Sequence, residues 1–328
     1  MSDPTTILPR EQLAIFQRKA TWFGAWMIAF NWLLIVASFA LVIIFPSALS
    51  FVIAWIVIGG RQLGLGILMH ETAHRSLLNS REANEWAGNW LCAAPMFADL
   101  EIYRGYHMTH HVKTGTVEDP DLPNYSGYPV KPISFVRKIL RDLFGVTGVK
   151  ALLTLAVLYS YEDPKSLKFG YAYRKQTADA TEVERVPLAK RVFYFLRNTR
   201  RVLVVQLLMF AALWALGHPL LYILWPVAWM TSYMVITRIR NAAEHGGLAG
   251  TMTTDMLRNT RTVIARWWER LTVAPNYVNF HFEHHLAPTV PSYNLPKLHA
   301  HLKAQGHLAD VQVLHGYGEV VKTLVRAK

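Results

Sequence analysis

Cysteine is almost absent from the sequence, since Cys92 is the only one among 328 residues. A single thiol excludes a disulfide within the chain. It also excludes thiolate zinc clusters and iron–sulfur centres held by this chain alone. Any metal that the chain binds must therefore use nitrogen or oxygen ligands.

Acidic residues are scarce relative to basic ones. The 22 Asp and Glu residues stand against 34 Lys and Arg residues, which gives a net charge of +12 at pH 7. This balance suits a nucleic acid, an anionic membrane surface or an acidic partner protein. The basic residues are dispersed around apolar segments, so we expect no nucleic-acid partner. The first twenty residues lack an apolar core with a cleavage site, and we expect no cleaved signal peptide.

Hydrophobic residues are abundant, at 52% of the sequence with a mean hydropathy of +0.18. The first long run holds 24 uncharged residues, which as a helix extends about 36 Å and can cross a membrane core of about 30 Å. Turn residues at 46–47 and 217–219 divide the runs into two hairpins. The sequence therefore predicts four spanning helices, at about 22–45, 48–69, 202–216 and 219–236.

Basic residues outside these spans predict their orientation. Three precede the first span, 19 lie in residues 70–201 and 11 follow residue 236. By the positive-inside tendency, both termini and the long middle segment are expected on the cytoplasmic side of the membrane. We expect this membrane to be a bacterial inner membrane. We therefore expect one all-α integral-membrane domain over residues 1–328, with a cytoplasmic helical cap from 70–201 and 237–328.

Three smaller features of the apolar regions carry expectations of their own. Residues 88–96 and 146–159 are too short to span, so we expect re-entrant or interfacial helices there. Arg61 is the one basic residue inside a span. We expect it to snorkel or to pair with a backbone carbonyl rather than to take part in catalysis.

Histidines form the clearest chemical pattern. Nine of the 14 fall into four clusters with helical spacing, and residues three or four apart on a helix share a face. Each cluster is therefore expected to direct its imidazoles at one point. Nine imidazoles exceed the three or four that one zinc ion uses, which favours two metals. The clusters are His70 and His74; His107, His110 and His111; His245; and His281, His284 and His285.

The remaining histidines are expected to lie outside the metal site, because a lone histidine is usually a hydrogen-bonded structural residue. They include His299, whose role the sequence leaves undecided, and His218, His301, His307 and His315. Three glutamates, Glu71, Glu244 and Glu283, each adjoin a clustered histidine. Such carboxylates either orient an imidazole or are solvated, and the sequence favours neither role.

These clusters resemble the histidine boxes of the membrane fatty acid desaturase and hydroxylase superfamily, and the chain looks most like bacterial fatty acid desaturase family proteins. The resemblance covers roughly residues 20 to 300, and the order of spans agrees. Its boxes are H-E-T-A-H at 70–74, H-M-T-H-H at 107–111 and H-F-E-H-H at 281–285. Similar flanking elements are the acidic turn at 116–121, N-A-A-E-H at 241–245 and the proline-rich stretch at 286–295.

The resemblance implies a specific metal centre. In this superfamily, nine histidines surround two irons, and a residue matching Asn241 contacts the centre through water. Substrate chains enter a tunnel below the metals, and O₂ is the co-substrate. The chain has no His-Pro-Gly-Gly haem signature. An external electron donor is therefore expected, such as a ferredoxin, a rubredoxin or a cytochrome b5-like protein.

The third box and its context favour desaturation of the acyl chain of a lipid or fatty acid. Lipid hydroxylases and carotenoid ketolases of the same superfamily are the alternative, and a decarboxylase that forms a terminal alkene is a more distant one. A membrane metal transporter or sensor is an alternative of another class. Transport requires polar residues near the middle of the spans, where the sequence offers little beyond Asn31, Arg61 and Gln62. Catalysis is therefore favoured.

Overall fold

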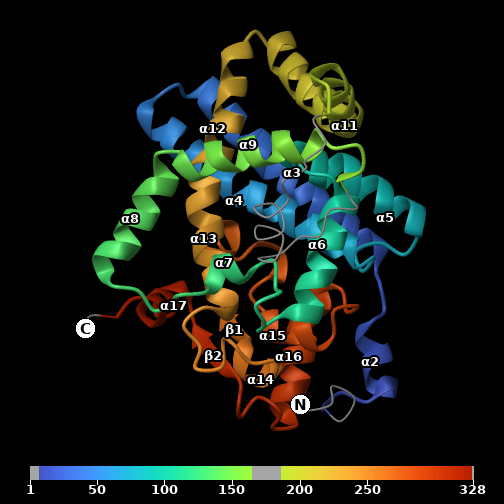
Figure 1. Cartoon of the computed structure of the whole chain (residues 1–328), viewed down its shortest axis with the longest axis vertical. Coiled ribbons are helices and arrows are strands. Elements are labelled where there is room, and N and C mark those ends of the chain that lie inside the picture. The colour runs from blue at the N-terminus through green and yellow to red at the C-terminus, as the bar shows by residue number, and fades with distance from the viewer. Residues whose placement is uncertain (1–6, 165–185, 327–328) are drawn as a thin grey trace.

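The computed structural model describes residues 7–164 and 186–326, and it is mostly helical (Figure 1). The first part contains α2 (Arg10–Phe16), α3 (Thr21–Ile44), α4 (Ala48–Ala73), α5 (Arg81–Ala87), η1 (Gly88–Ala93), η2 (Ala94–Met96), α6 (Leu100–Lys113), α7 (Leu122–Tyr125), α8 (Pro132–Leu143) and α9 (Val146–Tyr159). The second part contains α11 (Leu188–Ala215), η4 (Pro219–Ile223), α12 (Leu224–Met230), α13 (Ser232–His245), α14 (Met256–Asn259), β1 (Arg261–Ile264), η5 (Glu269–Leu271), η6 (Pro275–Tyr277), α15 (His281–Leu286), η7 (Ser292–Asn294), α16 (Leu295–Ala304), β2 (Gln312–His315) and α17 (Tyr317–Leu324).

The first hairpin consists of α3 and α4. A capping box starts α4: the Ser47 hydroxyl accepts a hydrogen bond from the Ser50 amide, and the Ser50 hydroxyl accepts one from the Ser47 amide. The two helices approach closely at Gly64, where a Cβ atom would lie 2.0 Å from the Asn31 side-chain oxygen. A Cβ atom at residue 64 would therefore displace this amide, which also accepts a hydrogen bond from Arg61. The first histidine box lies at the far end of α4, where His70 is in the last turn and His74 caps the helix.

Three helical segments within the described chain are long and apolar enough to cross a membrane: α3, α4 and the run Pro219–His245. The pair α8 and α9 passes the same test together but bends by 59°, as in a broken span or a re-entrant loop. The protein is an integral membrane protein. Exposed apolar side chains along α3, such as Trp22, Leu33 and Val36, suit contact with lipid.

The observed helix bounds differ from the predicted spans. The second and fourth helices continue beyond residues 69 and 236 and carry His70 and His245 at their ends. The third predicted span, 202–216, is the second half of α11, and this helix is not among the three candidate spans. Its first half contains Arg197, Arg200 and Arg201, which lower its hydropathy. The division of the chain into four spans stays a prediction.

Residues 88–96, expected as a re-entrant or interfacial helix, form η1 and η2 within the protein. Cys92 and Ala93 are buried. The carbonyl of Pro95 accepts hydrogen bonds from the side chains of Gln206 and Trp225, at 3.0 and 3.1 Å. Side chains of α11 and α12 therefore satisfy the Pro95 carbonyl at the end of these short helices.

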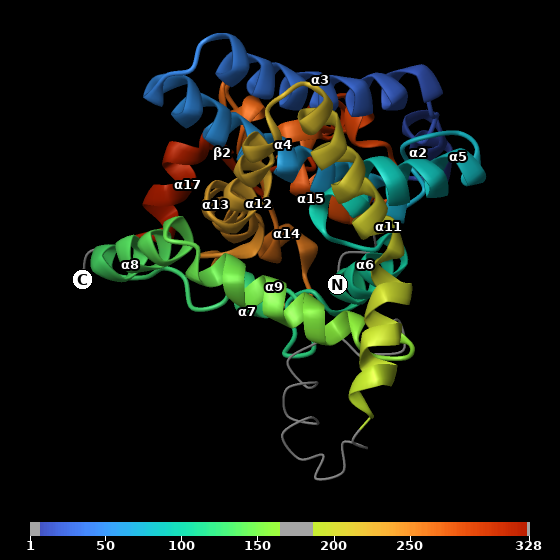
Figure 2. The same cartoon turned by 90° about the horizontal axis from the view of Figure 1, so that it is seen from above.

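The C-terminal part departs from the all-helical expectation at one place, a two-stranded parallel sheet. Strands β1 and β2 pair from Arg261 opposite Gln312 to Ile264 opposite His315. An apolar core that includes Phe282, Leu298 and Leu302 packs α15 against α16. Figure 2 shows α3 along one edge of the molecule, with α8 and α9 along the opposite edge and α12, α13 and α15 between them. Helices α13 and α15, which carry four of the clustered histidines, thus lie between these two edges.

Candidate metal centre

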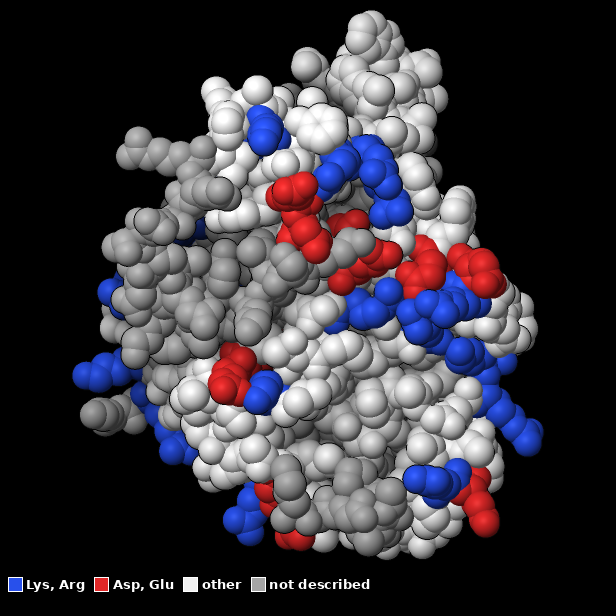
Figure 3. Space-filling view, turned by 45° about the vertical axis from the view of Figure 1, so that its right-hand side comes forward, with Lys and Arg blue, Asp and Glu red and all other residues white. Residues whose placement is uncertain are grey.

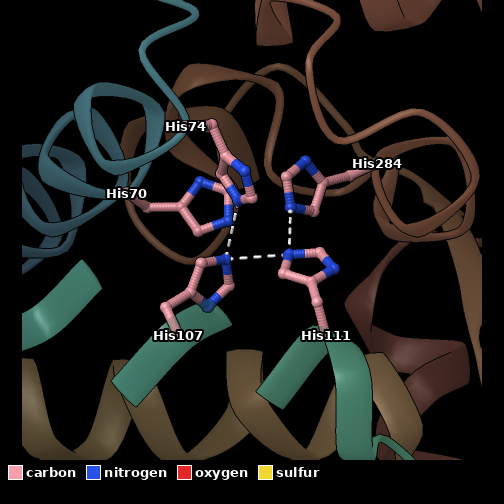
Figure 4. A group of neighbouring side chains, drawn as sticks. All are labelled: His70, His74, His107, His111 and His284. Carbon is pink, nitrogen blue, oxygen red and sulfur yellow. Dashed lines mark hydrogen bonds between the residues drawn. The ribbon is translucent and has the colours of Figure 1, made fainter. Parts of the chain in front are cut away.

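Nine histidines converge in two groups at the ends of α4 and α13 and on α6 and α15. Within each group, one ring nitrogen of every member lies within 4.8 Å of those of the others. Figure 4 shows the first group, whose rings come from three separate regions of the chain and face one another. The first group is His70, His74, His107, His111 and His284, and the second is His110, His245, His281 and His285. These nine are the residues that the sequence predicted.

The expectation that each cluster points at one place was wrong for the second and third boxes. Residues four apart on an α-helix differ by about 40° in direction, whereas adjacent residues differ by about 100°. His107 and His111 therefore face the first group, and His110 turns to the second. In the third box, His281 and His285 face the second group and His284 the first. Each of these boxes thus bridges the two groups.

The geometry of the rings suits metal binding through Nε2. The Nε2 atom of His107 lies 2.9 Å from those of His74 and His111. In the second group, the Nε2 atoms of His281 and His245 are 2.8 Å apart. The Nε2 atoms of His70 and His285 are buried and have no hydrogen-bond partner. Unpartnered buried nitrogens are costly unless something binds them, and a metal ion would satisfy both.

Burial keeps most of these imidazoles in the neutral form that a metal requires. Desolvation and the neighbouring histidines lower the pKa of His107, His281, His284 and His285 well below the ordinary value. Desolvation lowers the pKa of His74 to about 4. An all-imidazole set suits zinc, copper, iron or nickel, so the donor atoms do not select the metal.

Four of the nine rings have a partner on the nitrogen that points away from the centre. The Nδ1 atom of His70 lies 3.1 Å from Glu71 Oε1. His110 Nδ1 lies 2.9 Å from Asp119 Oδ1, and His245 Nδ1 lies 2.8 Å from the carbonyl of Asn259. The fourth pair is His281 Nδ1 and Glu244 Oε1, at 3.1 Å. Such acceptors fix the ring tautomer and leave the Nε2 lone pair free for the centre.

Comparison with known proteins places this centre in a family. The family model described as "Fatty acid desaturase" matches residues 46–316. The chain belongs to the fatty acid desaturase family. It is therefore a desaturase-family oxidoreductase rather than a metal transporter or sensor.

Relatives of this desaturase-family chain are distant. It is 28% identical over 272 residues to dihydrorhizobitoxine desaturase of Bradyrhizobium elkanii. The aligned region covers 80% of this chain and 70% of the relative. It is 26% identical over 318 residues to sn-1 oleoyl-lipid 12-desaturase of Synechocystis sp., covering 92% and 81%. It is 24% identical over 260 residues to a chloroplastic omega-6 fatty acid desaturase of Arabidopsis thaliana, covering 75% and 52%.

Asp119 contacts a histidine of the candidate metal centre, and the sequence alone did not predict this contact. Its side chain is 0% exposed, and Oδ2 accepts a hydrogen bond of 2.5 Å from the Tyr125 hydroxyl. Burial lowers the pKa of His110, but the hydrogen bond to Asp119 and the nearby carboxylates outweigh this effect and raise it. The acidic turn at 116–121 was the available signal, although the sequence does not say which of its carboxylates meets a histidine.

The three glutamates next to the boxes behave differently from one another. Glu71 contacts its neighbour His70, whereas Glu244 contacts His281 and forms an ion pair with Arg240. Glu283 lies 2.5 Å from His299 Nδ1 and accepts a hydrogen bond from Thr262. Adjacency in sequence therefore identified the partner only for Glu71.

Asn241 and the five unclustered histidines lie outside the two histidine groups. Asn241 lies one turn before His245 on α13, and its side-chain oxygen accepts a hydrogen bond of 3.0 Å from Arg240. Its contact with the centre through water stays a prediction. Among the described residues, the two groups leave out His218, His299, His301, His307 and His315.

Proposed function

We propose that the two histidine groups hold two iron ions and that the protein uses O₂ to desaturate the acyl chain of a lipid or fatty acid. The observation that carries this proposal is the pair of buried, largely neutral imidazole groups in a chain of the desaturase family. Relatives named for oleoyl-lipid and omega-6 fatty acid desaturation support an acyl substrate.

The overall reaction must balance in electrons and protons. Removing two hydrogens from adjacent carbons while reducing O₂ to two waters needs two further electrons and two protons. When bound, the irons would supply the one-electron chemistry that activates O₂ and an unactivated C–H bond. The residues of the chain hold the imidazoles neutral and fix four of them through Glu71, Asp119, Glu244 and the Asn259 carbonyl. Burial keeps bulk water away from the centre.

Those electrons are proposed to come from a separate carrier, such as a ferredoxin, a rubredoxin or a cytochrome b5-like protein. The net charge of +12 favours an acidic carrier, because opposite charges speed association. The basic residues do not form a purely positive surface, since Figure 3 shows acidic side chains next to basic ones on one face. Both termini and the cap are proposed to face the cytoplasm, where such carriers occur.

The direct test is product analysis with purified, iron-loaded protein. We expect stearoyl or oleoyl lipid, supplied with O₂ and reduced ferredoxin, to lose two hydrogens and to gain no oxygen. Mass spectrometry after incubation under ¹⁸O₂ measures both changes, and an anaerobic incubation is the control. A product that gains one labelled oxygen would instead assign the protein to the hydroxylases or ketolases of the same superfamily.

Replacing Asn241 with alanine tests the predicted water contact. We expect iron content near the wild-type value and turnover lowered by about tenfold or more, because the amide would position a water at the centre without binding a metal itself. Metal analysis and product formation measure the two quantities, with Asn79→Ala, an exposed asparagine, as the control. Full turnover of Asn241→Ala would remove Asn241 from the site.

A further inference from the structure

A second feature of the molecule is an apolar pocket with a cationic end. Its volume is about 210 Å³. Side chains of α3 and the η6 region form most of the wall, and Arg61 of α4 and Arg270 of η5 supply the charge. The lining residues are Phe23, Trp26, Met27, Phe30, Arg61, Arg270, Ala274, Asn276 and Tyr277. Four of the nine lining residues are aromatic and two are arginines.

Arg61 is buried without a counter-ion. Its side chain is 1% exposed, Nη1 donates to the Asn31 side-chain oxygen at 3.2 Å, and Nη2 donates to the Arg270 carbonyl at 3.0 Å. The carbonyl contact agrees with the expectation from the sequence. Nε has no partner, and among residues 7–164 and 186–326 no carboxylate forms an ion pair with Arg61. A buried, uncompensated guanidinium is costly, and an anionic ligand would compensate it.

Local packing brings Arg270 to the same place. A Cβ atom at Gly60 would lie 2.7 Å from the Leu271 carbonyl, so glycine lets this loop approach α4 closely. In Figure 2, orange segments of the chain lie beneath α3. The neighbouring Glu269 does not line the pocket, and its carboxylate instead accepts hydrogen bonds from the backbone amides of Arg266 and Tyr317.

We propose that this pocket binds the anionic head group of an acyl amphiphile, a carboxylate or a phosphate, through Arg61 and Arg270. The aromatic side chains Trp26, Phe30 and Tyr277 would then enclose the first methylene groups, since ligand sites combine an apolar wall with a few placed polar groups. The inference rests on the proposed function for its choice of an acyl ligand.

Two chain segments connect the pocket with the metal centre. Arg61 precedes His70 on α4 by nine residues, about 13.5 Å along the axis. Tyr277 precedes His281 by four residues. A head group held at Arg61 would therefore lie about 13.5 Å from His70 along α4.

Binding can be measured without turnover. A brominated stearate bound in the pocket should quench the fluorescence of Trp26, and the quenching should be smaller in Trp26→Phe. We expect the brominated acid to bind purified full-length protein at least about tenfold more tightly than its uncharged methyl ester. A brominated lysophosphatidate measured alongside decides whether carboxylate or phosphate is the preferred head group, and tighter binding of either anion than of the ester supports the pocket.

The discriminating variant is Arg270→Gln, because the side chain of Arg270 is exposed and only its backbone carbonyl holds Arg61. We expect about tenfold weaker binding of the anion and unchanged binding of the ester. The matched control is Arg266→Gln, a basic residue of the same loop that lies over the Trp268 ring and outside the pocket. Equal binding of acid and ester by the wild type, or an equal loss in Arg266→Gln, would overturn the inference. Neither result depends on which reaction the metal centre catalyses.

Discussion

Replacing His245 with alanine should leave about one metal ion per chain instead of two and lower turnover by about a hundredfold or more. His245 belongs to the group of four, and its loss leaves three imidazoles there. Its Nδ1 atom contacts the Asn259 carbonyl, and its Nε2 atom lies 2.8 Å from that of His281, so the ring is oriented toward the other members of the group. Metal analysis and product formation on the same preparation measure the two effects, and thermal unfolding shows whether the variant is folded.

The companion variant His284→Ala should be milder in metal content, because the group of five keeps four imidazoles. Turnover should still fall strongly, since His284 also connects the third box to the first group. The matched control is His301→Ala: this histidine lies on α16, contacts Gln12 at 3.0 Å and belongs to neither group. Two metals and full turnover in His245→Ala would show that the second group is not a metal site.

The histidines were predictable because their spacing carries the geometry. Positions 70 and 74, 107 and 111, and 281 and 285 are each four apart, and this spacing selects one face of a helix without knowledge of the fold. The division into two groups follows from the same helical angle and separates histidines that belong to one box. Adjacent histidines at 110 and 111 cannot face one point.

Partners of the histidines were less predictable, because they depend on tertiary contacts. The Asn259 carbonyl lies 14 residues from His245, and a backbone oxygen has no sequence signature. Glu244 turns to His281 of another segment rather than to its neighbour. Two adjacent side chains on a helix point in directions about 100° apart. A carboxylate next to a histidine therefore often contacts the ring of another histidine.

Hydropathy predicted where the long apolar helices lie but not the residues at which they begin and end. The runs at 22–45 and 48–69 appear as α3 and α4, although α4 extends four residues further to Ala73. Helix α11 is longer than its apolar run because its charged first half is also helical, and arginine favours helices about as well as leucine. Apolar length therefore located the helices better than it located their ends.

Removing the charge of Asp119 should disturb the second group without removing one of its imidazoles. Asp119 is fully buried, and its Oδ1 atom contacts His110 Nδ1 and accepts a hydrogen bond from the Asp121 amide at 2.8 Å. In Asp119→Asn the amide group can donate toward His110, which favours the tautomer with its hydrogen on Nε2 and blocks that lone pair. We expect metal affinity or turnover to fall by about ten- to a hundredfold.

Tyr125→Phe separates orientation of His110 from general packing. This variant removes the hydroxyl that donates to Asp119 Oδ2 but keeps the carboxylate and its contact with His110. If the carboxylate acts by fixing the ring, Tyr125→Phe should lose clearly less metal affinity and turnover than Asp119→Asn, because the carboxylate still contacts His110 Nδ1. Titration of metal-depleted protein with Fe²⁺, followed by turnover, measures both variants. Both variants break the same network of packed side chains, but only Asp119→Asn changes the partner of His110 Nδ1. Equal losses in the two variants would therefore mean that Asp119 supports the fold around His110 and does not set the tautomer of its ring.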